Sequence, residues 1–196
     1  MTKGSPAQDN TGKDVSLYLG VKDNSLIAYF EGPTGADYSV TDSSNTNVAD
    51  SAWHLGVVSA TSGAMKLYVD GAQVGQSAPA QSPASSETNA FMVGRGCFNG
   101  FTTSCSGQFR GFIASTTVWD QVLSAGQVSQ LYSTCNIVSL PAPVLDLSMQ
   151  GILPAAADGA LLSSSYEVPS SVGSLRAIVG GAPQYADVAN AVCSPS

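Results

Sequence analysis

The chain has 196 residues, a length that suits one all-β sandwich or two small domains, and we predict one domain. Only 11% of the residues are charged and the net charge is −7, so the clustered Lys and Arg needed to bind nucleic acid or an anionic membrane are missing. We therefore expect no nucleic-acid partner and no membrane insertion. The 20 glycines and the 43% apolar fraction favour many short strands and turns over a helical bundle.

The first half of the chain predicts two groups of strands. Residues 15–21 and 26–30 alternate in polarity on either side of a polar turn, which is typical of a β-hairpin. Residues 32–50 are rich in Asp, Asn, Ser, Thr and Gly and predict a long loop with one strand near Tyr38. Residues 55–60, 65–70 and 72–75 predict a three-stranded meander, in which Asp70-Gly71 forms a type I′ turn.

The second half is less regular. Residues 90–94 predict a buried strand, and residues 108–119 predict a longer one whose Phe109, Phe112 and Trp119 enter the core. Ser124 can cap a short helix over residues 124–132, because Val128, Leu131 and Tyr132 then share one face. Further strands are expected at 144–149, 165–168 and 176–179, after the proline-rich stretch 141–143.

The four cysteines indicate disulfides rather than a zinc site, because they lack CxxC spacing and His54 is the only histidine. Three connectivities are open. Cys97 and Cys105 flank a compact glycine-rich loop and form the favoured pair, which leaves Cys135 with Cys193. Two structural disulfides would place the chain in an oxidising compartment, outside the cell or on its surface. The polar start at residues 1–4 is not a signal peptide, so an exported form would have lost its signal or would be part of a longer precursor.

Several motifs together resemble the laminin G-like and pentraxin-like domains of the concanavalin A-like lectin/glucanase superfamily. These motifs are Trp53-His54, the strand and turn at residues 67–71, the F-x-G-x-I segment at 109–113 and Leu131-Tyr132. Their order and spacing agree over residues 15–132. The resemblance implies an all-β fold, a two-sheet antiparallel jelly-roll sandwich, for residues 1–140.

Two segments depart from the family order. Residues 144–149 and 180–185 resemble strands that normally precede the region with which this chain begins. Residues 141–196 therefore either complete the same sandwich in a circularly permuted order or begin a neighbouring repeat, with strand exchange between chains. Both alternatives make the late strands join a sheet that the early strands begin.

Catalytic residues are not expected. Glycosidases of this fold need two adjacent carboxylates, whereas Glu31, Glu87 and Glu167 are isolated in different segments. We expect His54 to serve packing and a hydrogen bond rather than to act as a base, since no G-x-S-x-G motif accompanies it. No cofactor is required by these residues.

The long acidic loop could hold calcium, because it offers carboxylate and amide oxygens. The candidate ligands in this loop are Asp37, Asp42, Asn45, Asn47 and Asp50, and Asp23 and Asn24 in a turn are further candidates. The competing interpretation is that Asp and Asn stand there because turns favour them.

We expect a non-catalytic extracellular structural or adhesive module that assembles with other protein chains, including copies of itself, at the cell surface. The first alternative is a carbohydrate-binding lectin, with or without calcium, and a glycoside hydrolase is a remote one. Tyr18, Tyr29 and Tyr38 could stack on a glycan if they face outward.

Overall fold

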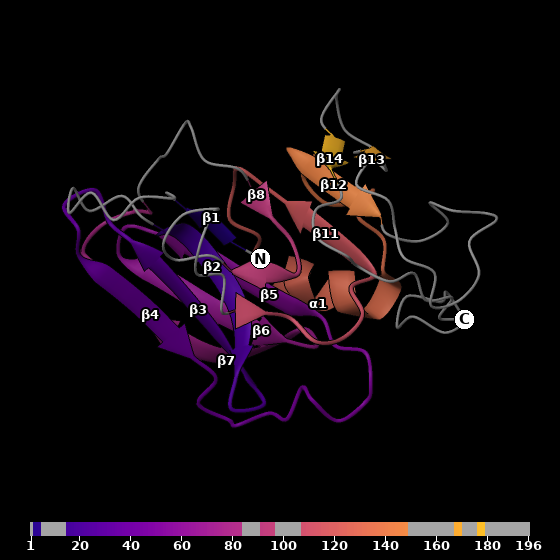
Figure 1. The fold of residues 1–196 in the computed structure, drawn as a ribbon, viewed down its shortest axis with the longest axis horizontal. Helices are drawn as coiled ribbons and strands as arrows, with labels where there is room; N and C mark the ends of the chain where they lie inside the picture. Colours follow the sequence, from indigo (N-terminus) through magenta and orange to yellow (C-terminus); the bar gives the residue numbers. More distant parts are fainter. Residues whose placement is uncertain are drawn as a thin grey trace. The chain divides into compact units, whose positions relative to one another are not determined.

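A computed structural model describes residues 2–4, 15–83, 91–96, 107–148, 167–169 and 176–178 (Figure 1). The chain divides into two compact units. The first unit contains Met1–Arg110 and Val122–Cys135, and the second contains Gly111–Gln121 and Asn136–Ser196. Each unit is described below by itself.

The larger sheet of the first unit has five antiparallel strands, in the order β4-β3-β2-β1-β8. Their bounds are β1 Thr2–Gly4, β2 Val15–Lys22, β3 Ser25–Glu31, β4 Asp37–Thr41 and β8 Phe91–Met92. Asp23 and Asn24 join β2 to β3 with φ angles of 52° and 66°, the positive values that a type I′ turn requires. The predicted hairpin is therefore confirmed. Strand β1 was not predicted, because three residues of a polar segment carry no periodic signal.

The second sheet of this unit is the predicted meander, β5 (Gly56–Thr61), β6 (Ala64–Val69) and β7 (Ala72–Ser77). Asp70 and Gly71 have φ angles of 50° and 81° and connect Val69 to its partner Ala72, as the Asp-Gly pair predicts. The pairing of β6 with β7 shifts register between Leu67 and Tyr68.

The two sheets enclose one hydrophobic core. Alternate residues of β3 and β6 point into it and are buried: Leu26, Ala28 and Phe30 from β3, and Met65, Leu67 and Val69 from β6. Val40 of β4 and Val74 of β7 complete the core. Beside them, a Cβ on Gly75 would overlap the carbonyl oxygen of Thr41, so glycine lets β7 approach β4 closely. This arrangement is the antiparallel sandwich that the sequence predicts.

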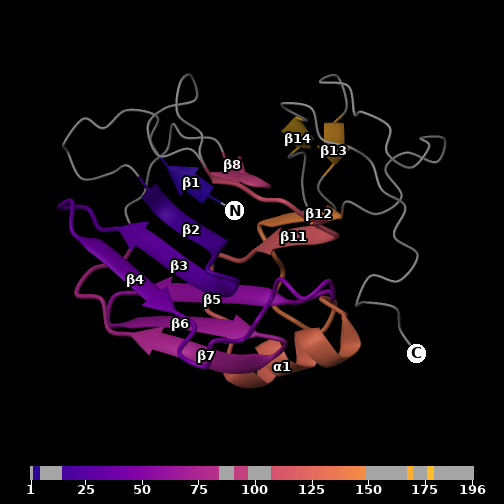
Figure 2. The same ribbon diagram turned by 60° about the horizontal axis from the view of Figure 1, so that its bottom comes forward.

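Helix α1 (Ala125–Thr134) packs against the second sheet, under β7 in Figure 2. Ser124 caps it as predicted: its hydroxyl accepts from the Gln127 N–H at 3.2 Å, and its own N–H donates to the Gln127 side chain at 2.8 Å. Val128 and Leu131 are buried, whereas Tyr132 is 38% exposed. The helix therefore has the predicted buried face, although Tyr132 lies at its margin.

The second unit contains the late strand that departs from the family order. Strand β12 (Leu145–Ser148) pairs antiparallel with β11 (Ser115–Val118) of the same chain. Trp119 donates its indole N–H to the Pro141 carbonyl at 2.9 Å, and Leu147 is buried. Two further strands, β13 (Glu167–Pro169) and β14 (Arg176–Ile178), pair with each other. That residues 141–196 complete the sandwich of residues 1–140, or begin a neighbouring repeat, stays a prediction, and residues 180–185 lie outside the described residues.

The long strand predicted over residues 108–119 is wrong. The segment contains β10 (Gly107–Gln108), which pairs with β9 (Arg95–Gly96), and then β11, with irregular backbone between them. Phe109 and Phe112 are 44% and 60% exposed rather than buried. The physical reason is their spacing, because residues three apart lie on opposite faces of a strand and cannot both enter one core. The strand predicted at 90–94 is likewise reduced to β8.

Two glycines allow a matched test of the turn that meets the helix. Gly63 and Gly71 have φ angles of 83° and 81°, but a Cβ on Gly63 would meet nothing within 4 Å, whereas one on Gly71 would lie 3.2 Å from the Ser129 Cα of α1. Gly63→Ala should cost about 1 kcal/mol, since it adds only the left-handed strain. Gly71→Ala should cost about 1–3 kcal/mol more, because it also overpacks the helix contact. Urea unfolding measures both, and equal losses would contradict this account of Gly71.

Candidate functional site

The most connected polar cluster joins His54 to two aspartates. Nδ1 of His54 lies 2.8 Å from Oδ2 of Asp70, and Nε2 lies 3.0 Å from Oδ1 of Asp50. The second oxygen of Asp70 accepts the Leu55 N–H at 2.9 Å, and the Asp70 N–H donates to the Leu55 carbonyl at 2.9 Å. Asp50 also accepts the Ala52 N–H at 2.8 Å. The cluster ties the loop before β5 to the turn between β6 and β7.

The two carboxylates alter the protonation of the histidine. Burial lowers the pKa of His54, but the hydrogen bonds to Asp50 and Asp70 and their negative charges outweigh this effect, so its pKa lies above the ordinary 6.5. The hydrogen bond from His54 is the main reason that the pKa of Asp50 lies below its ordinary value. Both ring nitrogens face carboxylates that also accept backbone N–H groups, so the cluster holds the loop before β5 against the β6–β7 turn. This agrees with the hydrogen-bonding role expected of His54. We call His54, Asp50 and Asp70 the clasp.

Four of the five calcium ligands predicted in the loop have separate local roles. Asp42 is buried, and its two oxygens accept the N–H groups of Ser44 and Thr46 at 2.7 and 2.9 Å. Asn47 accepts the Ala49 N–H at 3.0 Å. The remaining aspartates are Asp50 of the histidine cluster and Asp37, which accepts the Tyr29 hydroxyl at 2.6 Å.

Only two of the five ligands come together. Asp42 and Asn45 line one depression together with Asp23 of the turn, whereas Asp37, Asn47 and Asp50 do not. In the part of the chain that the structure describes, no group of three or more His, Cys, Asp or Glu side chains could hold a metal ion. Calcium binding at these five residues stays a prediction.

The depression that contains Asp42 and Asn45 lies at the turn end of the larger sheet and has a volume of about 210 Å³. We call it the turn depression. Its lining is mostly polar, with one charge of each sign at its exposed rim. The lining residues are Lys22, Asp23, Ser25, Leu26, Ile27, Thr41, Asp42 and Asn45. Sequence reasoning missed Lys22, Ser25 and Thr41, which only strand pairing brings to the loop.

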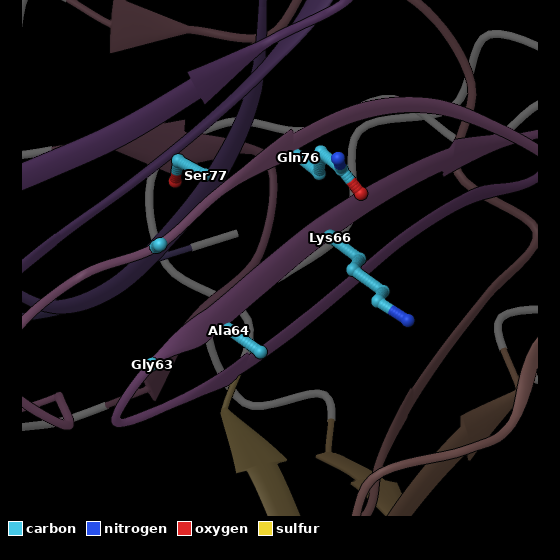
Figure 3. A pocket seen from close by; sticks show the side chains of 6 residues that line it. Gly63, Ala64, Lys66, Gln76 and Ser77 are labelled. Atoms are coloured by element: carbon cyan, nitrogen blue, oxygen red, sulfur yellow. The ribbon is translucent and has the colours of Figure 1, made fainter.

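A second depression of about 280 Å³ lies on the other sheet, between the β5–β6 turn and β7 (Figure 3). Lys66 and Gln76 stand opposite each other on paired strands, and their side chains extend from the same face. The Ser77 hydroxyl is buried and lacks a hydrogen-bond partner within the described residues. Gly63, Ala64 and Ala78 complete the lining of this open depression, and Lys66 is its one cation.

The three tyrosines considered as ligand platforms divide between the two faces of the larger sheet. Tyr38 packs against the core, with its ring centroid 5.1 Å from that of Phe30. Tyr18 and Tyr29 are directly paired on β2 and β3 and lie on the opposite face, since their neighbours Leu19 and Ala28 face the core. Both are half-buried, and burial raises the pKa of Tyr18 above its ordinary value.

Cys135 ends α1 in the left-handed conformation, with φ of 52°, and is disulfide-bonded. The other three cysteines, Cys97, Cys105 and Cys193, lie outside the described residues. The predicted pairing of Cys97 with Cys105 and of Cys135 with Cys193 therefore stays a prediction.

The histidine cluster predicts a pH-dependent stability. A histidine whose folded pKa is raised stabilises the fold fully below its unfolded pKa, and this contribution is lost as pH rises through the folded pKa. The lowered pKa of Asp50 makes its contribution disappear only in strong acid. His54→Gln should therefore lower Tm by roughly 2–4 °C between about pH 4 and 6.5, and by less at pH 8.

Thermal unfolding followed by circular dichroism across this pH range measures the difference. Asp70→Asn is the control, because it can keep the hydrogen bond to Leu55 while removing the charge beside His54, and it should flatten the same pH dependence. A His54→Gln deficit that is equal at pH 5 and pH 8 would refute the clasp.

Comparison with known proteins gives a match to a family model. No curated protein and no solved structure matches the chain. Among the described residues, no helix has both the length and the apolar character needed to cross a membrane. The family model described as the concanavalin A-like lectin/glucanases superfamily, in its laminin G form, matches residues 2–129, about two thirds of the chain. The chain therefore belongs to this laminin G-like family of the concanavalin A-like superfamily.

Proposed function

We propose that this chain is a non-catalytic assembly module of the extracellular space or cell surface, which joins other protein chains, including copies of itself, through a sheet edge. Laminin G-like domains commonly bind proteins or glycans, which is the general background to this proposal. The more specific support comes from strand β5.

Strand β5 forms an edge of its sheet among the described strands. Within the described part of the chain it pairs on one side only, with β6. Its sequence, GVVSAT, contains no charge and no proline, and none of its six residues is fully buried. Proteins usually protect such edges with charges, prolines or bulges, because unpaired N–H and C=O groups invite another strand.

The core is also incompletely covered beside this edge. Val58 and Ala60 of β5 and Leu17 and Leu19 of β2 pack against the core but stay partly exposed. A strand added to β5 would pair its backbone and cover part of this apolar surface at the same time. Both gains favour association by strand addition.

The described carboxylates support a role without catalysis. Asp42 holds backbone N–H groups, Asp50 and Asp70 hold His54, and Asp146 accepts the Thr117 hydroxyl at 2.9 Å. These aspartates build turns and strand contacts rather than the carboxylate pair of a glycosidase. The disulfide bond at Cys135 suits an oxidising compartment.

A single charge on β5 tests this proposal. Ser59 stands directly opposite Lys66, so Ser59→Glu adds a charge to the edge while creating a cross-strand pair of opposite charges within the chain. We expect the wild-type chain to self-associate with rising concentration and Ser59→Glu to weaken this association by about tenfold or more. Sedimentation velocity measures both.

Gln73→Glu is the matched control, since it adds the same charge at an exposed position of β7 in the same sheet. It should associate like the wild type. A wild-type chain that stays monomeric at every concentration, or a control that loses association equally, would refute assembly through β5.

A carbohydrate-binding role is the second candidate, and the turn depression favours it. Lys22 and Asp23 are exposed there, with Ser25, Thr41 and Asn45 beside them. Charged, hydroxyl and amide groups around a shallow hollow can hydrogen-bond the hydroxyls of a sugar. Binding of a glycan by a monomer, without self-association, would favour this candidate over assembly.

A further inference from the structure

One face of the larger sheet combines an aromatic surface with the turn depression. On β2, β3 and β4, the residues that alternate with the core form two adjacent rows across the strands. The first row is Tyr18–Tyr29–Ser39, and the second is Gly20–Ile27–Thr41. We call this surface, together with the turn depression, the outer face.

The ring of Tyr18 lies along its own strand, β2, above Gly20. A Cβ on Gly20 would overlap the phenol ring of Tyr18, so the ring occupies the space that any larger residue would fill. Tyr18 and Tyr29 are cross-strand neighbours, and the Tyr29 hydroxyl is fixed by its hydrogen bond to Asp37. The Tyr18 ring points towards Gly20, whereas the Tyr29 hydroxyl reaches the other way along the sheet, to Asp37 opposite Glu31. The half-buried Tyr18 ring therefore forms a platform held close to the sheet, at low entropic cost for a ligand, and Tyr29 borders it.

The turn depression begins at the next row. Ile27, the cross-strand neighbour of Gly20, and Thr41, which pairs with Ile27, both line it. Its walls are held in place by the backbone hydrogen bonds of Asp42 and by Ser43, whose N–H donates to the Val74 carbonyl at 2.9 Å. Its volume of about 210 Å³ corresponds to about seven water molecules at roughly 30 Å³ each, enough for part of an oligosaccharide but not for an enclosed ligand.

Charge narrows the class of ligand. Asp37 borders the platform, Asp23 lies in the depression, and the chain as a whole has a net charge of −7. Lys22 is the one cation that lines the turn depression. An acidic glycan would therefore meet net repulsion, whereas a neutral sugar can place its C–H face on an aromatic ring and its hydroxyls against Lys22, Thr41 and Asn45.

We propose that the outer face binds neutral oligosaccharides, with one sugar stacked on the Tyr18 ring and the next seated in the turn depression. This inference rests on the carbohydrate-binding candidate of the proposed function and gives it a site and a ligand class. Gly20 has a positioning role, since its missing side chain lets the Tyr18 ring lie on the strand.

Isothermal titration with cellohexaose, laminarihexaose and β-1,4-galactohexaose tests the proposal. At least one should bind to the wild-type chain, and Tyr18→Ala should weaken it by about tenfold. Gly20→Ala should cause a similar loss by displacing the ring. The double variant Tyr18→Ala/Gly20→Ala should bind no more weakly than Tyr18→Ala alone, because the second change then has no ring to displace.

Tyr132→Ala, which removes a partly exposed tyrosine from α1, is the control and should bind like the wild type once circular dichroism shows it folded. Ser59→Glu should also keep full binding, so that a failure of edge assembly is told apart from a failure of this site. If a hexaose binds equally to the wild type and to Tyr18→Ala, the site is refuted while carbohydrate binding stands. If no neutral hexaose binds at millimolar concentration, or only acidic oligosaccharides bind, the proposal is overturned.

Discussion

The hydrogen bonds of the Asp70 carboxylate link the polar loops at this end of the sandwich, and the neighbouring elements depend on them. Asp70 occupies a turn position with positive φ, accepts the Leu55 N–H with one oxygen and faces His54 with the other. The next residue, Gly71, lies against Ser129 and Tyr132 of α1. The Asp70 side chain therefore ties the start of β5 to the turn between β6 and β7, and Gly71 in the same turn supplies the surface for the helix. The strand and turn at residues 67–71 matter because they fix these neighbours, not because they perform chemistry.

Most acidic side chains that the structure describes likewise stabilise a turn or a neighbouring side chain. Asp42 organises the loop after β4, and Asp37 holds Tyr29. Groups that are committed to backbone N–H bonds and turns are poorly placed to become nucleophiles or general acids. The two proposed recognition surfaces lie between these turns, namely the uncharged edge of β5 and the outer face of β2, β3 and β4.

Local signals in the sequence were sufficient for much of the fold. Asp23-Asn24 and Asp70-Gly71 predict their turns because only certain residues accept positive φ, and Ser124 predicts the start of the helix. The reciprocal capping by Gln127 is added by the structure. Strand β1 and the irregular segment around Phe109 and Phe112 were not predictable in this way. The first depends on pairing with distant β2 and β8, and the second has aromatic residues whose spacing fits no single face.

The candidate sites were less predictable than the fold. The density of Asp and Asn in residues 37–50 suggested a shared ion site, but a sequence does not show which backbone N–H each carboxylate will accept. The position of the Tyr18 platform beside the turn depression could be found only from the pairing register of β2 and β3, and the role of Gly20 only from the direction of the Tyr18 side chain. These features depend on tertiary contacts, so they cannot be predicted from composition or periodicity.

On this interpretation, the laminin G-like domain recognises its partners through sheet surfaces and does not convert them. Mass spectrometry of neutral hexaoses after prolonged incubation with the purified chain distinguishes recognition from conversion. Every oligosaccharide should keep its original length, including any that binds the outer face. Shortened products that appear in proportion to the amount of protein would contradict this interpretation.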